Sequence, residues 1–186
     1  MSNKTACIIL ADGFEEVEAL MPADIFKRLK INVILVGLKD KLVTGAHGFQ
    51  ITANTLAKDI SVADFDALIL PGGLPGATNL QSSPIVTDLL HQANAQNKIC
   101  AAICAAPIVL HDTGVAQGKT ITGYPGCEGL AKQPNCSFSG ANVEVDGNII
   151  SAIGMGKAHL FAFAIAKALG ISAQEINNLA AGAFLD

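Results

Sequence analysis

One cysteine of this chain stands where a strand is expected to turn into a helix. Ile99–Ile103 is a short apolar run typical of a buried strand, and a second apolar stretch beginning at Pro107 predicts a helix. Cys104 lies between them, with a pair of alanines on each side. A sharp turn needs such small neighbours, and it places the thiol near the positive end of a helix dipole, which favours thiolate. Because a free cysteine is often only a small buried hydrophobe, the segment alone leaves both a nucleophile and a core residue open.

A cluster of glutamates follows the first expected strand. Residues 6–10 form a continuous apolar run, and Glu15, Glu16 and Glu18 come in the first turn of the helix expected next. Such a cluster is usually a solvated face that complements the helix dipole. Glu15 and Glu18 share a helix face, whereas Glu16 points elsewhere. A buried glutamate beside a thiol would have a raised pKa and could donate a hydrogen bond to the sulfur, but the spacing does not say which glutamate does so.

A glycine pair follows the third expected strand, residues 66–70. By itself, Pro71-Gly72-Gly73 is most simply a tight turn. Glycines there can also let a substrate approach backbone N–H groups, and the amides of Gly73 and of Ala105, the residue after the cysteine, could form an oxyanion hole. If the three strands are neighbours, an acid, a donor-rich turn and a thiol converge beyond their carboxyl ends, as in sites for covalent acyl or carbonyl chemistry.

The pattern of apolar runs predicts the elements that position these residues. Strands are expected at 6–10, 32–38, 66–70, 99–103 and 120–122, with a hairpin or an edge excursion within 41–54 and a hairpin within 143–151. Helices are expected at 15–30, at 84–97, after Cys104, at 158–169 and after Ser172. Pro22 is expected to break or kink the first helix. Alternating strands and helices predict a doubly wound α/β fold with a mostly parallel sheet, and the length of 186 residues fits one domain over 1–186.

Composition narrows the class of function. Apolar residues make up 51% of the chain and charged residues 15%, which suggests that part of the surface faces another subunit. The net charge of -4 and the lack of a lysine or arginine cluster argue against nucleic-acid binding. No apolar run reaches the roughly 18 residues that predict a membrane span. The start of the chain lacks a signal-peptide pattern, so a cytoplasmic location is expected.

The other cysteines and the histidines do not complete a different site. The five cysteines are odd in number and scattered, which argues against a disulfide framework and against zinc, and we expect no metal. Cys100 is expected to be buried and inert, since a disulfide with Cys104 needs α-carbons within about 7 Å. His91 and His111 fit solvent-facing helix positions and His159 a helix face. The residue after Cys104 is not histidine, which argues against a cysteine peptidase.

Three motifs together resemble one family over essentially the whole chain. They are Leu-Ala-Asp-Gly-Phe-Glu-Glu-Val-Glu-Ala at 10–19, Leu-Pro-Gly-Gly at 70–73 and Ala-Ala-Ile-Cys-Ala-Ala-Pro at 101–107. They resemble the ThiJ/PfpI superfamily, in the branch of Parkinson disease protein 7, the protein deglycase, and of the YajL chaperone. The turn Gly-Met-Gly at 154–156 fits the same branch. The resemblance implies a flavodoxin-like three-layer sandwich with a mostly parallel central sheet, of the class I glutamine amidotransferase-like type.

The resemblance also implies a site and an activity. Cys104 corresponds to the reactive cysteine of the turn, and Glu18 to a protonated carboxylic acid that hydrogen-bonds its sulfur. Gly73 and Ala105 match the backbone amides that line the site. The family implies a homodimer with its interface near the cysteine, and chemistry without a cofactor on methylglyoxal or glyoxal adducts of proteins or nucleotides. Glyoxalase activity, oxidation of the cysteine to sulfinate, protection against oxidative stress and chaperone action are implied as well.

Two positions depart from the family pattern. Tyr124 stands where the deglycase carries a histidine, and a tyrosine does not replace histidine well in proton transfer at neutral pH. His47 stands roughly where the family has an arginine, which removes a fixed positive charge. The leading hypothesis is a cysteine-dependent deglycase or glyoxalase-type hydrolase that acts on a small aldehyde or glycated substrate. The alternative is a redox-sensing protein or redox-regulated chaperone that uses oxidation of Cys104 and has little catalysis.

Overall fold

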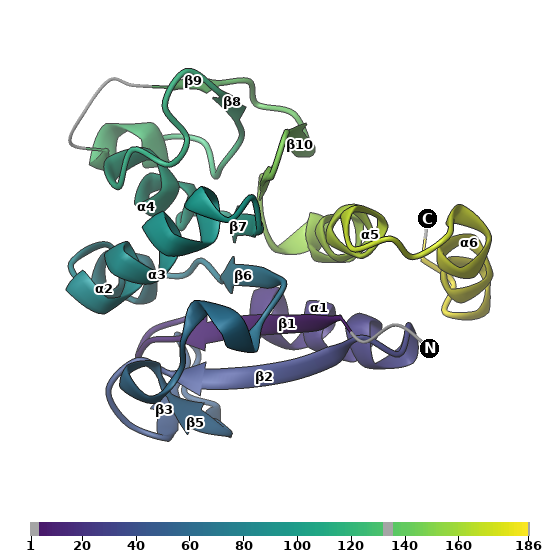
Figure 1. The fold of residues 1–186 in the computed structure, drawn as a ribbon, viewed down its shortest axis with the longest axis horizontal. Coiled ribbons are helices and arrows are strands. Elements are labelled where there is room, and N and C mark those ends of the chain that lie inside the picture. Colours follow the sequence, from purple (N-terminus) through teal and green to yellow (C-terminus); the bar gives the residue numbers. More distant parts are fainter. Residues whose placement is uncertain (1–3, 132–135, 186) are drawn as a thin grey trace.

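A seven-stranded sheet forms the centre of the molecule in the computed structural model, which describes residues 4–131 and 136–185 (Figure 1). Its strands follow the order β10-β11-β7-β6-β1-β2-β5, and every neighbouring pair is parallel except β10 with β11. They are β1 (Thr5–Leu10), β2 (Asn32–Gly37), β5 (Thr55–Leu56), β6 (Ala67–Leu70), β7 (Ile99–Ile103), β10 (Val143–Asp146) and β11 (Ile149–Ala152). The predicted mostly parallel sheet is therefore confirmed.

Two small sheets lie beside the central one. They are an antiparallel hairpin of β3 (Leu42–Thr44) with β4 (Gln50–Thr52), and a parallel pair of β8 (Thr120–Ile121) with β9 (Ser137–Phe138). A hairpin or an edge excursion was expected within 41–54, and the structure shows a hairpin. The tip of this hairpin reaches the candidate site through His47.

Helices cover both faces of the central sheet. They are α1 (Glu16–Arg28), α2 (Gly76–Gln81), α3 (Pro84–Ala95), α4 (Pro107–Asp112), α5 (Ala158–Ala168) and α6 (Ala173–Gly182). Short 3-10 turns are η1 (Ala57–Asp59), η2 (Val62–Asp64), η3 (Cys127–Leu130) and η4 (Met155–Lys157). One core cluster joins the sheet to α2, α3 and α4, and a second joins its other face to α1, α5 and α6, which gives the expected three layers (Figure 1).

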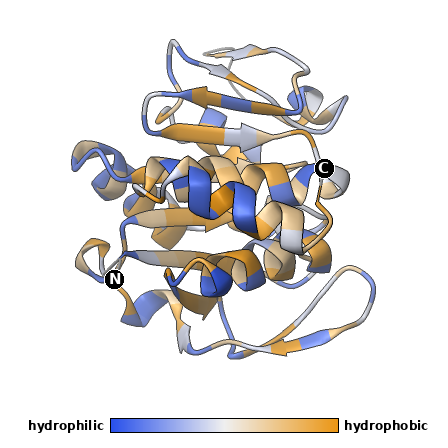
Figure 2. Cartoon of the chain, turned by 90° about the vertical axis from the view of Figure 1, so that its right-hand side faces the viewer, coloured by the Kyte–Doolittle hydropathy of each residue, from blue (hydrophilic) through white to orange (hydrophobic). Residues whose placement is uncertain are grey.

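The apolar composition of the central strands explains why they lie in the middle of the sheet. β1, β6 and β7 are apolar at nearly every position because both of their faces are covered, and the central strands are largely orange in the hydropathy view, whereas the helices carry blue stretches (Figure 2). Ser83 caps α3 and is followed by Pro84, and Ser172 forms a capping box with Glu175 at α6. Across the described residues, no helix is long and apolar enough to cross a membrane.

Two details of the helices differ from expectation. Pro22 was expected to break or kink the first helix, and it does not break it, since α1 continues unbroken to Arg28. Pro22 is buried and α1 packs on α5, so this packing holds the helix together although residue 22 cannot donate a bond to the Glu18 carbonyl. The second difference is α2, a short helix that periodicity did not reveal because it spans fewer than two turns.

Candidate active site

The carboxyl ends of three neighbouring strands meet at the candidate site. β7, β6 and β1 are adjacent in the sheet, so the segments that follow them lie side by side. These segments contribute Cys104 and Ala105, the glycine turn with Gly73, and Glu18 in α1. Ligands of doubly wound sheets bind at this edge. The structure thus brings together all the site residues that the sequence predicted.

Cys104 occupies a strained turn that is held from both sides. Its φ of 64° lies in the left-handed region, which residues other than glycine rarely adopt. Its N–H donates to the carbonyl of Ala152 at 2.9 Å, and its own carbonyl accepts from the N–H of Tyr124 at 2.7 Å. The flanking alanines are buried, so larger side chains would not fit there. This backbone aims the sulfur away from the sheet and into a pocket.

Glu18 is the glutamate that faces the cysteine. Its side chain is fully buried, and Oε2 accepts a hydrogen bond from the N–H of Gly72 at 2.9 Å. Oε1 is buried with no partner at ordinary hydrogen-bond geometry among the described residues. Besides the Gly72 amide, the Cys104 thiol and the backbone of Met155 lie close enough to the carboxyl to act on its pKa through hydrogen bonding. Because a buried anionic oxygen without a donor is costly, this environment favours a protonated Glu18.

Glu18 and Cys104 titrate as a pair. Burial, with help from the Glu15 carboxylate, raises the pKa of Glu18 to about 7. Burial and the negative charge of Glu18 raise the pKa of the Cys104 thiol to about 12, whereas backbone N–H groups of Gly73 and Ala105 act to lower it. The expectation that the start of the following helix favours thiolate is therefore wrong, because burial and the charge of Glu18 outweigh any effect of α4, which has only six residues. A proton on Glu18 removes the charge repulsion and supplies a donor, so protonation of Glu18 makes ionisation of the Cys104 thiol less unfavourable.

Replacing Glu18 by glutamine should change how stability depends on pH. The pKa of Glu18 rises from 4.5 to about 7 on folding, so between these values the folded protein holds a proton that the unfolded chain has released. Rising pH through this window therefore destabilises the wild type, by about 3 kcal/mol in total, and Glu18→Gln removes this dependence. Chemical denaturation of both proteins at pH 4.5, 6 and 8 measures the difference. Parallel pH profiles of the two unfolding free energies would contradict a raised pKa.

The glycine turn is tightly packed against the segment after β1. Gly73 has a φ of 84°, and a Cβ on it would lie 2.5 Å from the backbone N of Glu15, so this position requires glycine. The carbonyl of Gly72 accepts from the same Glu15 N–H at 2.9 Å. These contacts fix the Gly73 amide beside the Cys104 sulfur, where it also could bind a substrate oxygen.

A largely apolar pocket of about 560 Å³ opens above the sulfur. Apart from the glutamates and Cys104, its walls include Tyr124, Pro125, Ile153 and Met155, with Lys157 at its edge. Tyr124 is 58% exposed, so its ring lies at the pocket opening instead of in the core. The pocket is much larger than a three-carbon aldehyde, and it therefore has room for an aldehyde attached to a carrier.

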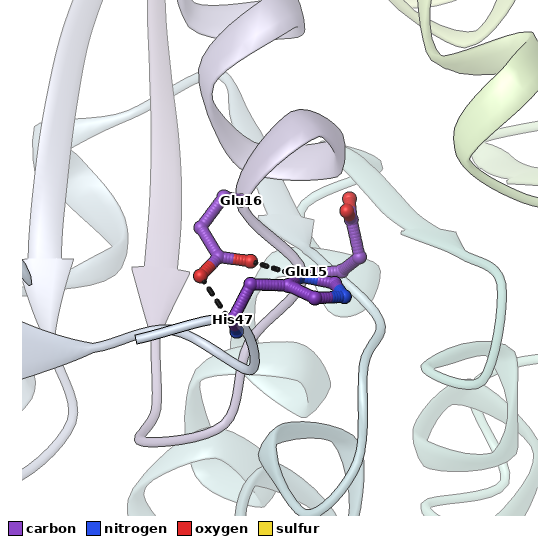
Figure 3. A group of neighbouring side chains, drawn as sticks. All are labelled: Glu15, Glu16 and His47. Carbon is purple, nitrogen blue, oxygen red and sulfur yellow. Dashed lines mark hydrogen bonds and ion pairs between the residues drawn. The ribbon is translucent and has the colours of Figure 1, made fainter. Parts of the chain in front are cut away.

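Glu15, Glu16 and His47 form the group of described residues that could hold a metal ion, with one ligand atom of each within 4.8 Å of the others (Figure 3). Hydrogen bonds of these residues account for their positions without a metal ion. Glu16 accepts from the backbone N–H of His47 at 2.9 Å and pairs with its Nδ1 at 2.8 Å, while Glu15 accepts from the N–H of Glu18 at 2.8 Å. We therefore interpret the group as a connection between α1 and the tip of the β3–β4 hairpin.

The pKa shifts of Glu16 and His47 favour opposite charges on the two side chains, which strengthens the connection between α1 and the hairpin. Burial acts to raise the pKa of Glu16, but the hydrogen bonds from His47 outweigh it and the pKa is lowered. The hydrogen bond to Glu16 raises the pKa of His47. His47 lines the pocket as well, so the position that departs from the family pattern lies at the candidate site.

Two histidines and Cys100 lie away from the candidate site. His111, expected to face solvent, is 3% exposed and pairs through Nδ1 with Asp112 at 2.8 Å, so that prediction is wrong. His91 is exposed as expected. Cys100 is buried and packs in the cluster on the α3 side, whereas Cys104 packs on the opposite side, and both are free thiols. Cys100 therefore does not contribute to the candidate site.

The family resemblance drew attention to Tyr124 and to the turn at 154–156, but not to the pocket wall that they form together. Gly154 and Met155 follow β11 and lie next to Tyr124, which follows β8. The amide that binds the Glu18 carboxyl belongs to Gly72, and it was not singled out either. The Gly-Met-Gly turn at 154–156 was a signal that could have pointed to the wall, since glycines often mark places where a ligand approaches the backbone.

Comparison with known proteins places the chain in a family. The model of the DJ-1/PfpI family matches residues 4–168. Protein dj-1beta of Drosophila melanogaster is 38% identical over 168 residues, which cover 90% of each chain, and the crystal structure of Drosophila melanogaster DJ-1beta gives a TM-score of 0.93 at 37% identity over 100% of both chains.

Two further relatives agree with this placement. A Parkinson disease protein 7 homolog of Danio rerio is 36% identical over 172 residues, 91% of each chain. A protein named as a deglycase from Pyrococcus abyssi is 31% identical over 146 residues, 78% of this chain and 87% of that relative. The resemblance drawn from the three motifs is confirmed, and the chain belongs to the DJ-1/PfpI family.

Proposed function

We propose that the protein is a cysteine-dependent hydrolase of the deglycase or glyoxalase type, acting on methylglyoxal, glyoxal or their adducts. The observation that carries this proposal is the pairing of Cys104, in its strained turn, with the fully buried Glu18 at the base of an open pocket. A carboxyl group whose pKa is about 7 can both give and take a proton at neutral pH. The deglycase name of one relative supports the same class of reaction.

The residues present supply each step of such a reaction. The Cys104 thiolate attacks the aldehyde carbon of methylglyoxal, the carbonyl π bond breaks, and its oxygen takes the proton of Glu18. The Gly73 and Ala105 amides stabilise the negative charge that develops on that oxygen. Glu18 then removes the proton from this carbon and returns it to the neighbouring one, while the hydroxyl proton on the first carbon moves to the oxygen on the second. The first carbon regains a C=O double bond, and the product is a thioester of lactate. Water cleaves the thioester, so methylglyoxal and water become lactate with no external oxidant or reductant.

An adduct follows the same route with one more bond broken. When the aldehyde carbon carries an amine, as in a glycated side chain or base, the carbon–nitrogen bond breaks and the free amine leaves with a proton. Formation of lactate from methylglyoxal by the wild-type protein, together with a lactoyl group on Cys104 after acid quenching, tests the proposal. No lactate above the protein-free rate would contradict it.

We also propose that a second copy of the chain covers part of the surface near the pocket. Val17 on α1 is 37% exposed and Met155 is 53% exposed, and both are apolar. A homodimer would cover such residues, and sedimentation equilibrium at micromolar concentration distinguishes it from a monomer. Action in the cytoplasm, protection against oxidative stress and a chaperone role belong to the same proposal.

A second candidate function is redox sensing through Cys104. Among the five cysteines, Cys7, Cys100 and Cys127 are buried, whereas Cys104 opens onto the pocket next to two amides and the buried Glu18 carboxyl. These groups would also stabilise a sulfinate. We expect dilute peroxide to convert Cys104 to sulfinate before any other cysteine, as read by mass spectrometry of tryptic peptides. Equal oxidation of Cys104 and the partly exposed Cys136 would contradict a sensor built on this site.

A further inference from the structure

Part of the open pocket lies between the Cys104 sulfur and Gly154. Gly154 follows β11 and borders the pocket together with Cys104 and Tyr124. A methyl group on the Gly154 Cα would lie 4.0 Å from the sulfur and 3.8 Å from Cδ2 of Tyr124, and no other described atom outside its chain neighbours would come within 4 Å. The space is therefore bounded by the sulfur on one side and the tyrosine ring on the other.

The backbone at this position does not explain the glycine. Gly154 has a φ of 161° and a ψ of -175°, which is extended backbone that any residue adopts. Contacts of 3.8 and 4.0 Å are ordinary van der Waals distances, so alanine would fit without displacing its neighbours. Gly72 and Gly73 differ in this respect, because a Cβ on either would overlap other atoms. What the glycine at 154 provides is empty space next to the sulfur.

We propose that Gly154 keeps this space free for the group attached to the second carbon of a 2-oxoaldehyde, such as the methyl group of methylglyoxal. The inference rests on the proposed function and names the substrates that the site accepts. When the sulfur is bonded to the aldehyde carbon, the methyl carbon is three bonds away from it, which matches a position in van der Waals contact with the sulfur. The ring of Tyr124 then forms the apolar wall against which that group packs. Gly154 is thus a residue that determines specificity, and it takes no part in proton transfer.

The test compares Gly154→Ala with wild type on glyoxal, methylglyoxal and phenylglyoxal, whose products are glycolate, lactate and mandelate. A filled space should reduce kcat/KM for methylglyoxal at least about tenfold, the usual effect of one methyl group that no longer fits. The value of kcat/KM for phenylglyoxal should fall further. Glyoxal has no group on its second carbon, so kcat/KM for glyoxal should stay within about threefold of the wild-type value. Gly182→Ala, on the exposed end of α6, is the matched control and should leave all three rates unchanged.

The outcomes separate this inference from the proposed function. Equal losses for glyoxal and methylglyoxal, or no loss for methylglyoxal, would overturn the role of Gly154. If wild type makes no acid from any of the three, the proposed function fails. The rate at which N-ethylmaleimide alkylates Cys104 then measures how much space lies beside the sulfur. Gly154→Ala should then slow alkylation at least about tenfold relative to Gly182→Ala, and equal rates would overturn the inference. Thermal unfolding of each variant confirms that the compared proteins are folded.

Discussion

Serine at position 104 should abolish lactate formation from methylglyoxal. The hydroxyl group is close in size to the thiol, so the strained turn with its φ of 64° is kept while the nucleophile is lost. A serine hydroxyl beside a carboxyl group is not ionised at neutral pH, and His47, the histidine that lines the pocket, is already paired through Nδ1 with Glu16. We expect kcat to fall at least about a thousandfold, the range seen when a catalytic nucleophile is removed. The measurement is lactate against time at saturating methylglyoxal.

A matched substitution shows whether the loss belongs to this site. Cys136 is also partly exposed, and Cys136→Ser makes the same chemical change away from Glu18. It should keep wild-type turnover, and both variants should unfold at temperatures close to that of the wild type. Turnover retained in Cys104→Ser would show that lactate forms elsewhere on the protein, and the redox-sensing function would then become the better interpretation.

The fold was predictable because its strands are buried on both faces. β1, β6 and β7 are continuous apolar runs, and such runs alternating with helical segments allow few arrangements other than a parallel sheet. The turn at Cys104 was predictable for a local reason, since small residues and a following proline specify it. Local sequence therefore located the turn that holds Cys104 and the glycine turn before any tertiary contact was known.

The choice among the glutamates could not be made from local sequence. Glu18 faces the sulfur because α1 packs so that its carboxyl reaches the N–H of Gly72, a residue 54 positions later in the chain. Glu16, two residues earlier in the chain, reaches His47 on the hairpin instead. The same limit applies to Tyr124 and Gly154, which approach each other only when the loops after β8 and β11 meet. Each of these contacts depends on tertiary packing.

Alanine at position 72 should destabilise the protein and disrupt the site at once. A Cβ there would lie 2.6 Å from Oε2 of Glu18, 2.7 Å from Cβ of Cys104 and 2.7 Å from the carbonyl oxygen of Ile103. The last two belong to the end of β7 and the strained turn, so they cannot move without opening the sheet. We expect the free energy of unfolding to fall by about 3 kcal/mol, the upper part of the range for overpacking, and the melting temperature by about 10 °C. Calorimetry measures both.

The same substitution should remove turnover even in the fraction that stays folded. Glu18 must shift to admit the new methyl group, and it then loses the hydrogen bond that it accepts from the Gly72 N–H at 2.9 Å. The proton shared between Glu18 and Cys104 depends on that placement, so lactate formation should fall at a temperature where the variant remains folded. Gly129→Ala is the control, because a Cβ on Gly129 meets no described atom within 4 Å. Wild-type stability and turnover in Gly72→Ala would mean that the turn relaxes, and that the close approach of the acid to the cysteine is not what the reaction requires.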